Sequence, residues 1–240
     1  MKKGFYMKNL YSLLRSKVYP GRGIALGTTP SGKAVAIYFI MGRSASSRAR
    51  RFEMNGDDLV IKYISDNDPA HAELIVYSPV RVLGNKTIVT NGDQTDTICE
   101  GLRLGGSFES ALATRCFEPD PPHYTARISG LITLEDGQPS YKLSVLKAGD
   151  DEGKTCVRQF FDYEKQPGVG HFIHTYMGGS EKLITFAGEP IEVKIPEAPA
   201  YKLGMKLWDC LNYENKVALH VRVTDPETGK YEWCIYNKYV

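Results

Sequence analysis

The hydrophobic residues of this chain fall mainly into short runs that come in pairs, with a few turn-forming residues between the two members of each pair. Glycine, proline, asparagine and aspartate between two apolar runs are typical of antiparallel hairpins. Many of the runs are apolar at successive positions, as expected for strands that are covered on both faces. We therefore predict hairpins with turns at 30–33, 55–58, 84–85, 135–138 and 225–229.

A smaller part of the chain is predicted to be helical. An amphipathic helix is expected over residues 7–18, and two short helices are expected over 95–103 and 107–117. Residues 201–212 space their apolar side chains by three and four, which predicts one more helix. Because the strand pairs are interrupted by a central pair of helices, we expect one α+β domain layered in the order α/β/β/α.

Composition and charge narrow the classes of function. The chain has 240 residues, of which 42% are hydrophobic and 24% charged, and its formal net charge is +2. That charge is too small to predict a nucleic-acid or membrane partner. No apolar stretch approaches a membrane span, and the lysines near the N-terminus precede no long apolar segment of a signal peptide. The five cysteines lack CxxC spacing, which argues against a zinc site or a disulfide framework and predicts a reducing cytoplasm.

A segment rich in arginine and serine follows the apolar run at 34–40 and contains Arg43, Ser44 and Arg48. Guanidinium groups suit phosphate, and serine hydroxyls can complete an anion site. Arg22, in the preceding run of the same predicted hairpin, is expected to reach the same end of the sheet. The alternative interpretation is a solvated basic loop, because charge runs usually lie on the surface.

Two other stretches carry candidate acid–base groups. Tyr77 ends an apolar run, where its hydroxyl can pair within the core or can transfer a proton. The proline-rich stretch 118–127 restricts its backbone and so can hold Glu118 and Arg127 in fixed positions. The alternatives are a core tyrosine and a rigid surface loop with solvated charges.

The polar stretch NGDQTDTI, residues 91–98, follows an apolar run and precedes a predicted helix. Thr95 or Asp96 can cap that helix by accepting backbone N–H bonds. Helix N-termini favour anions, yet Asp93 and Asp96 would repel a phosphate. We therefore assign Asn91, Asp93, Thr95 and Asp96 to a base or ribose, or to the orientation of Arg48.

Taken together, these blocks resemble the archaeal-type IMP cyclohydrolase family. GRGIALGTTPSGKAVAIYFIMGRSASSR, a strand ending in Tyr77, VTNGDQTDTI and TARISG occur in the order of that family, over roughly residues 19–130. The most specific pieces are NGDQTDT and the spacing of Arg43, Ser44 and Arg48. The resemblance implies one domain over residues 1–240, with 1–18 as an extension, and a fold similar to the N-terminal-nucleophile hydrolases.

The resemblance also implies a reaction and roles for residues. The reaction is the ring closure of 5-formamidoimidazole-4-carboxamide ribonucleotide (FAICAR) to inosine monophosphate with loss of water, without metal or organic cofactor. By the same resemblance, Arg48 is an electrostatic stabiliser, Tyr77 is a proton relay, and Glu118 is the group that holds or deprotonates the carboxamide. Arg22, Arg43 and Ser44 become phosphate or ribose contacts.

Some features depart from this pattern or leave alternatives open. Position 2 is not Cys, Ser or Thr, so a free N-terminal nucleophile is not expected, and the sequence PDPPH at 119–123, next to Glu118, differs from the family pattern. The aromatic residues of 231–240 are expected to provide an oligomer contact or a second specificity. The alternative functions are another amidohydrolase on the same scaffold and a nucleotide-binding protein without catalysis.

Overall fold

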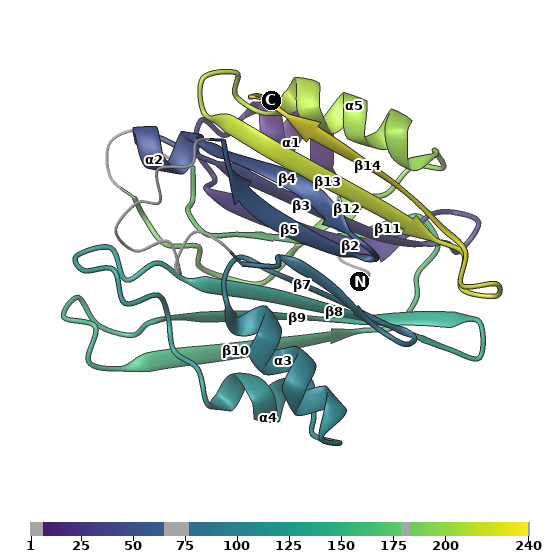
Figure 1. The fold of residues 1–240 in the computed structure, drawn as a ribbon, viewed down its shortest axis with the longest axis horizontal. Coiled ribbons are helices and arrows are strands. Elements are labelled where there is room, and N and C mark those ends of the chain that lie inside the picture. Colours follow the sequence, from purple (N-terminus) through teal and green to yellow (C-terminus); the bar gives the residue numbers. More distant parts are fainter. Residues whose placement is uncertain (1–6, 65–76, 179–182, 240) are drawn as a thin grey trace, which may run out of the picture.

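Two stacked β-sheets dominate the computed structural model, which describes residues 7–64, 77–178 and 183–239 (Figure 1). Within these residues each sheet has seven strands. Neighbouring strands of the first sheet are antiparallel, except that its first two strands are parallel. This sheet has the order β1 (Lys8–Asn9), β12 (Ile191–Lys194), β11 (Val169–His174), β2 (Arg22–Thr28), β3 (Ala34–Met41), β13 (Lys216–Thr224) and β14 (Tyr231–Asn237).

The second sheet is antiparallel throughout and is built from consecutive strands. All the predicted hairpins are confirmed: their turns join β2 to β3, and β13 to β14, in the first sheet, and three strand pairs in the second. The order of the second sheet is β10 (Cys156–Tyr163), β9 (Gln138–Ala148), β8 (Arg127–Glu135), β7 (Lys86–Thr90), β6 (Val80–Leu83), β5 (Asp58–Tyr63) and β4 (Arg50–Asn55).

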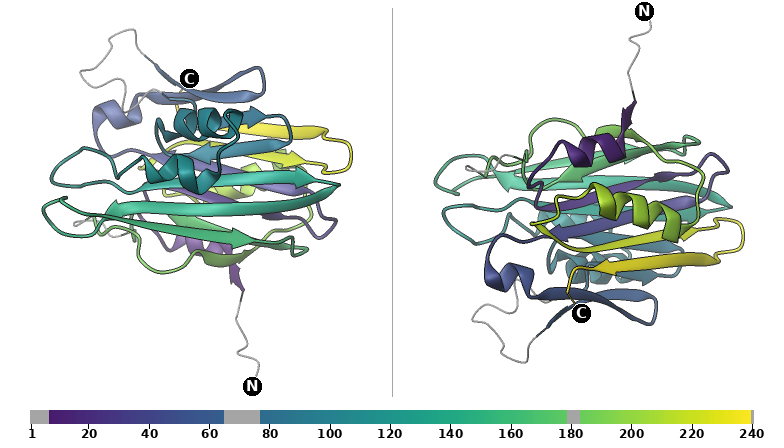
Figure 2. Two further views of the ribbon diagram at one scale, coloured as in Figure 1. Left: turned by 90° about the horizontal axis from the view of Figure 1, so that it is seen from below. Right: turned by 90° about the horizontal axis from the view of Figure 1, so that it is seen from above.

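Helices cover the outer faces of both sheets, so that the layers follow the order α, β, β, α (Figures 1 and 2). Helices α1 (Leu10–Arg15) and α5 (Ala200–Cys210) lie on the first sheet, and α3 (Gln94–Arg103) and α4 (Phe108–Ala113) lie on the second. A single turn, α2 (Ala45–Arg48), follows β3. The predicted α+β class is confirmed. In the described part of the chain no helix is long and apolar enough to cross a membrane.

Among the described residues, three hydrophobic clusters match these layers. The cluster between the sheets includes Ile24, Phe52 and Val145. On the outer faces, Leu207 of α5 packs with the first sheet and Phe108 of α4 with the second. Strand β3 is buried at every position because α5 covers one of its faces and the second sheet covers the other. The unbroken apolar sequence of this strand is thereby explained.

The helices differ from the predictions mainly at their ends. The helix predicted over 7–18 is shorter, because β1 precedes it and pairs with β12. Residues 107–117 form a helix only to Ala113, although Ser107 caps it as predicted. The predicted cap of α3 is wrong: Asp93 occupies the cap position, and the Thr95 hydroxyl bonds the Gly92 carbonyl at 2.9 Å instead. The strand predicted to end at Tyr77 falls partly on 65–76, which lies outside the described residues.

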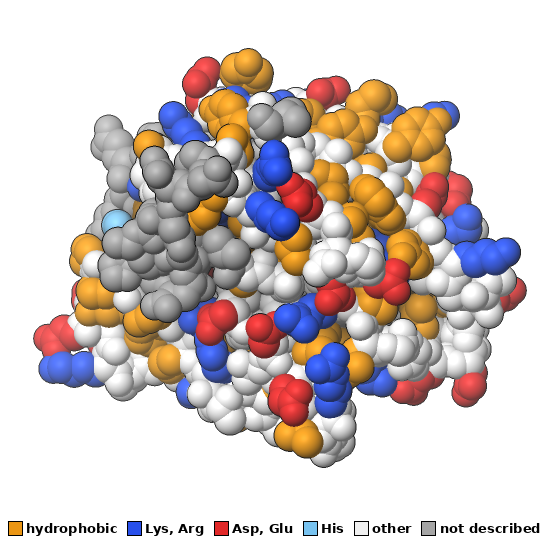
Figure 3. Space-filling view, in the orientation of Figure 1, with side chains coloured by type: hydrophobic (Ala, Val, Ile, Leu, Met, Phe, Trp, Pro, Cys, Tyr) orange, Lys and Arg blue, Asp and Glu red, His pale blue; other side chains and the backbone are white. Residues whose placement is uncertain are grey.

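Exposed aromatic residues gather on the C-terminal hairpin and on α5. Tyr231, Trp233 and Tyr201 are exposed, and hydrophobic side chains cover this face at the upper right of Figure 3. Strand β14 is also an edge of the first sheet. The oligomer contact expected from this hairpin stays a prediction.

One asparagine joins the two sheets where the edge strands β14 and β4 meet. The Asn237 side chain accepts from the Phe52 amide at 2.8 Å and donates to the Phe52 carbonyl at 3.0 Å. It therefore bonds the backbone of β4 as a neighbouring strand would. The Phe52 ring in turn stacks on Tyr38, with the ring centroids 5.6 Å apart. This contact fixes the position of β4 against the first sheet.

Replacing Asn237 by alanine should lower the free energy of unfolding by about 1–3 kcal/mol, because two backbone groups lose their partner. Asn237→Asp retains the acceptor but not the donor, so it should lose only part of that stability. Urea denaturation of both variants measures the difference. Equal stability of wild type and Asn237→Ala would contradict this role.

Buried histidines should make the fold sensitive to acid. Both ring nitrogens of His220 lack a hydrogen-bond partner within the described residues, and burial, aided by Arg222, lowers its pKa to about 3. Since an unfolded histidine titrates near 6.5, the unfolded state binds the proton first, and stability falls as the pH drops from about 6.5 toward 3.

His220→Leu should therefore reduce the stability lost between pH 7 and pH 5 by about 2 kcal/mol. His123→Leu is the matched control, because that histidine is exposed. Urea denaturation at both pH values gives the comparison. The role assigned to His220 is excluded if the two variants lose the same stability on acidification.

Candidate active site

A cluster of buried polar side chains occupies one end of the space between the sheets. Its members come from the start of β2, the end of β7, the start of β8 and the chain after β11. Antiparallel strands bring these ends together although they lie far apart in sequence. The remaining inter-sheet space is filled mainly by apolar side chains, so the polar cluster stands out as a site.

An ion pair between Arg22 and Glu118 lies at the centre of the cluster. The exposed fractions of the two side chains are 17% and 10%. Burial works against the charge of Arg22, but Glu118 and three tyrosines outweigh it and hold the pKa of Arg22 well above its usual range. Burial also raises the pKa of Glu118, although Arg22 and Arg127 oppose this shift. Glu118 is thus a carboxylate with increased proton affinity beside a permanent cation.

Two phenol groups meet beside this ion pair. The hydroxyls of Tyr38 and Tyr77 are 2.7 Å apart, and both side chains are buried. Burial raises the pKa of each phenol, and the nearby charges of Arg22 and Arg50 oppose the shift. Both phenols therefore keep their protons at neutral pH, and one donates to the other. A pair of this kind can pass a proton to a bound ligand.

Asn91, which follows β7 of the second sheet, holds the carboxylate of Glu118. Its amide nitrogen donates to Glu118 at 3.4 Å and to the Ala126 carbonyl at 2.9 Å. Its oxygen accepts from the Ile128 amide at 2.8 Å and from Gln94 at 2.9 Å. Asn91 is therefore saturated by the protein and acts as a clamp between the loop of Glu118 and β8.

Asp93 and Arg127 form a second ion pair next to this clamp. Arg127 donates to Asp93 at 2.6 Å and to Gln94 at 2.7 Å, and Arg115 reaches the other Asp93 oxygen at 2.5 Å. Burial would raise the pKa of Asp93, but the two arginines outweigh it and lower that pKa. Asp93 remains ionised and half exposed, so it can still contact a ligand.

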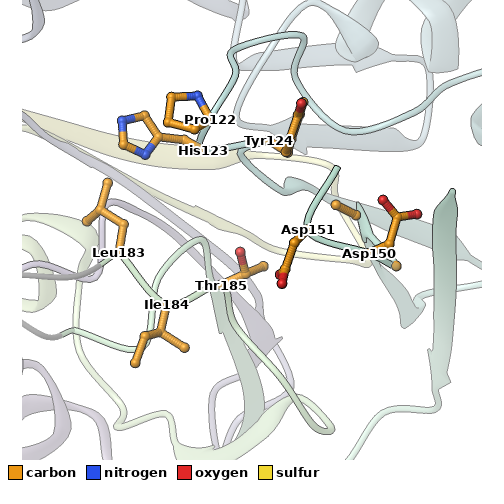
Figure 4. Close-up of a pocket in the computed structure, with 10 residues that line it drawn as sticks. Pro122, His123, Tyr124, Asp150, Asp151, Leu183, Ile184 and Thr185 are labelled. Carbon is orange, nitrogen blue, oxygen red and sulfur yellow. The ribbon is translucent and has the colours of Figure 1, made fainter. Parts of the chain in front are cut away.

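A cavity of 520 Å³ is lined in part by residues 122–124 of the loop that carries Glu118 (Figure 4). The Tyr176 hydroxyl lies 2.7 Å from that of Thr125, which donates to Asp120 at 2.5 Å. Tyr124, the neighbour of Thr125, lines the cavity, and so does Thr185, which forms a β-bridge with Tyr176. Figure 4 shows Asp151 on the side of the cavity near Thr185. The cavity therefore borders the loop that carries Glu118, and Asp150 and Asp151 are among the residues that line it.

The arginine and serine segment lies around α2. Ser44 caps this turn by accepting from the Ser47 amide at 3.2 Å, and it is exposed. The Arg48 Nε donates to the Gly42 carbonyl at 3.1 Å. The Arg43 guanidinium lies 4.8 Å from the centre of the Tyr19 ring, which stacks on Tyr176. Arg43 is thus connected to the cluster through two stacked rings.

Two residues of the NGDQTDTI stretch point to other partners. The Thr95 hydroxyl lies 2.6 Å from that of Thr90 and is buried, so it supports the turn. Asp96 pairs with Arg81 at 2.8 Å, and its side chain is 63% exposed. The structure therefore brings Arg22, Tyr77, Glu118, Asn91, Asp93 and Arg127 together, whereas the contacts of Arg43, Ser44, Arg48, Thr95 and Asp96 lie beside or outside the cluster.

Sequence reasoning missed four members of the cluster. Tyr38 is hidden in an apolar strand, although a buried tyrosine needs a partner for its hydroxyl, and this was the available signal. Arg50 was passed over in favour of its neighbours in the same basic run, yet it is only 5% exposed. Thr125 begins the TARISG block but is given no role from sequence, and Tyr176 lies outside the blocks that carry the resemblance.

Comparison with known proteins gives consistent matches. The model of a family described as IMP cyclohydrolase-like protein matches residues 19–229. The IMP cyclohydrolase of Methanocaldococcus jannaschii is 26% identical over 216 residues, which cover 88% of this chain and 96% of that protein.

Two further relatives align over shorter stretches. The IMP cyclohydrolases of Methanococcus maripaludis (strain S2) and Methanococcus aeolicus are 29% and 31% identical over 128 and 96 residues. These alignments cover 52% and 40% of this chain, and 63% and 47% of the two relatives. Because the family model extends over most of the sequence, the chain belongs to the family of IMP cyclohydrolase-like proteins.

Proposed function

We propose that this protein is an IMP cyclohydrolase that closes the ring of FAICAR to give inosine monophosphate and water. The observation that carries the proposal is the buried Arg22–Glu118 pair beside the hydroxyls of Tyr38 and Tyr77, in a chain that matches the family over 19–229. The names of the archaeal relatives support the same activity.

Glu118 is the proposed base for the nucleophile. The carboxamide nitrogen of the substrate is weakly nucleophilic, so it must lose a proton as it attacks the formyl carbon. A carboxylate with a raised pKa is suited to this task, because it binds the proton better than a solvated glutamate. Asn91 holds the Glu118 carboxylate in place, so this group is already oriented before the reaction begins.

The two phenols and Arg22 are the proposed partners of the formyl oxygen. This oxygen gains negative charge as the ring closes and must take up a proton before it leaves as water. Arg22 can stabilise the charge in a site shielded from water, where electrostatic interactions are strong. Tyr77 can donate the proton and recover one from Tyr38, because their hydroxyls are already hydrogen-bonded.

This assignment differs from the one made on sequence, which gave the electrostatic role to Arg48. Arg22 and Arg50 are the cations whose charges act on both phenols, whereas the Arg48 Nε is engaged by the Gly42 carbonyl. We therefore assign the transition-state charge to Arg22. Arg43, Ser44 and Arg48 are proposed to bind the phosphate or ribose, because the wall of the cavity near Asp151 is unsuited to an anion.

The scaffold is proposed to be similar to that of the N-terminal-nucleophile hydrolases. Two stacked sheets with helices on both outer faces support this similarity. The proposed reaction does not use a nucleophile at the chain terminus, since the groups assigned above come from β2, β3 and the loops around 77 and 118.

The direct test is to incubate purified protein with FAICAR and to follow the absorbance of inosine monophosphate. Tyr77→Phe should lower kcat about 100-fold or more, because it removes the proposed proton donor. Tyr38→Phe should lower kcat only about 10-fold, because it removes one hydrogen bond to that donor. Absence of turnover in the wild type, together with a rise in melting temperature on adding inosine monophosphate, would favour the nucleotide-binding alternative.

Exchanging arginine for lysine separates the two proposed arginine roles. Arg22→Lys keeps the charge but loses the planar donor, so kcat should fall about 100-fold. Arg48→Lys should mainly raise KM, because a phosphate contact serves the substrate and the transition state alike. Steady-state kinetics with FAICAR distinguishes them. A larger loss of kcat in Arg48→Lys than in Arg22→Lys would restore the assignment made on sequence.

A further inference from the structure

Two thiols meet at the edge of the second sheet, close to the loop that carries Glu118. Cys116 follows α4, and Cys156 is the first residue of β10. The two thiols lie close enough to interact, and the Cys156 thiol donates to the Val157 carbonyl at 3.8 Å. Arg158 supports this arrangement, because its Nε and Nη2 donate to the Arg115 carbonyl at 3.1 and 2.8 Å. Side chains two positions apart on a strand share a face, so Cys156 and Arg158 both face the segment of Cys116.

The two thiols differ in their access to solvent. Cys116 is exposed, whereas Cys156 is half-buried and packs against the cluster beneath α3 and α4. Burial, together with the contact to Cys116, raises the pKa of Cys156 to about 11. An oxidant in solution therefore reaches Cys116 first, and Cys156 is in position to react with the product.

We propose that Cys116 and Cys156 form a peroxide-reactive modification site whose disulfide clamps residues 115–118 to β10. In the first step the sulfur of Cys116 forms a bond to one oxygen of hydrogen peroxide, the O–O bond breaks, and the second oxygen leaves as water. In the second step the Cys156 sulfur attacks the Cys116 sulfur. The S–S bond forms, the S–O bond breaks, and the departing oxygen takes the Cys156 proton to become water. Two thiols and one peroxide thus give one disulfide and two waters.

The cross-link would affect two residues of the candidate site, Asp93 and Glu118. Arg115, next to Cys116, holds Asp93, and Glu118 lies two residues further along the chain. A disulfide has an S–S distance of about 2.05 Å, shorter than any contact between two thiols, so it draws this segment toward β10. Only this consequence for catalysis rests on the proposed function; formation of the disulfide does not.

The test is treatment of the reduced, full-length protein with hydrogen peroxide. Titration of the unfolded protein should find three thiols in place of the five in the sequence, and peptide mass spectrometry should find Cys116 linked to Cys156 within one chain. Cys116→Ser and Cys156→Ser should each abolish that linkage. Cys234→Ser is the matched control: its half-buried thiol donates to the Ala200 carbonyl, and its removal should leave the linkage intact.

The oxidised wild type should lose about 10-fold or more of kcat/KM, because groups that position a substrate tolerate little displacement. Dithiothreitol should restore the activity, and Cys156→Ser should not show this reversible loss. Retention of five thiols, a different linkage or a bond between two chains would overturn the proposal. Unchanged turnover in fully oxidised protein would overturn the clamp on Glu118, while the reduced sample assayed alongside tests the proposed function separately.

Discussion

The buried ion pair between Arg22 and Glu118 determines which polar groups must surround it. Removing two such charges from water costs several kcal/mol for each ion, and attraction between them offsets this only if the remaining donors and acceptors are also satisfied. Asn91 supplies one of these contacts to Glu118, and the phenols of Tyr38 and Tyr77 lie beside the ion pair. The polar end of the inter-sheet space is therefore an interdependent network rather than a set of separate contacts.

The stacked sheets make this network possible. Arg22 and Tyr38 belong to the first sheet, whereas Asn91 and Glu118 belong to the second sheet and its loops, so the site exists only while the layers remain in register. The apolar clusters on both sides of each sheet supply the burial that holds them together. The Asn237 bridge to β4 adds a directional contact at one edge.

The loop from Cys116 to Thr125 connects the candidate catalytic carboxylate to the rest of the fold. It carries Glu118 into the cluster, contributes Tyr124 to the cavity wall, and is fastened at its start to β10 by Arg158. Its position depends on contacts with both sheets. The contact of Arg158 with the Arg115 carbonyl lies only three residues from Glu118 along the chain.

The sequence by itself determined the local elements, since turn chemistry and apolar runs act between neighbours along the chain. It identified all the hairpins between the predicted strand pairs, the cap at Ser107 and several side chains that the structure places in the buried polar cluster, including Tyr77 and Glu118. Only the tertiary structure decided that Tyr38 faces Tyr77 and that Arg22 pairs with Glu118, as well as which arginines act on the phenols. These contacts join residues 39 and 96 positions apart, and the stacking of two sheets selects them. Periodicity along one strand cannot specify which side chain lies opposite on another layer.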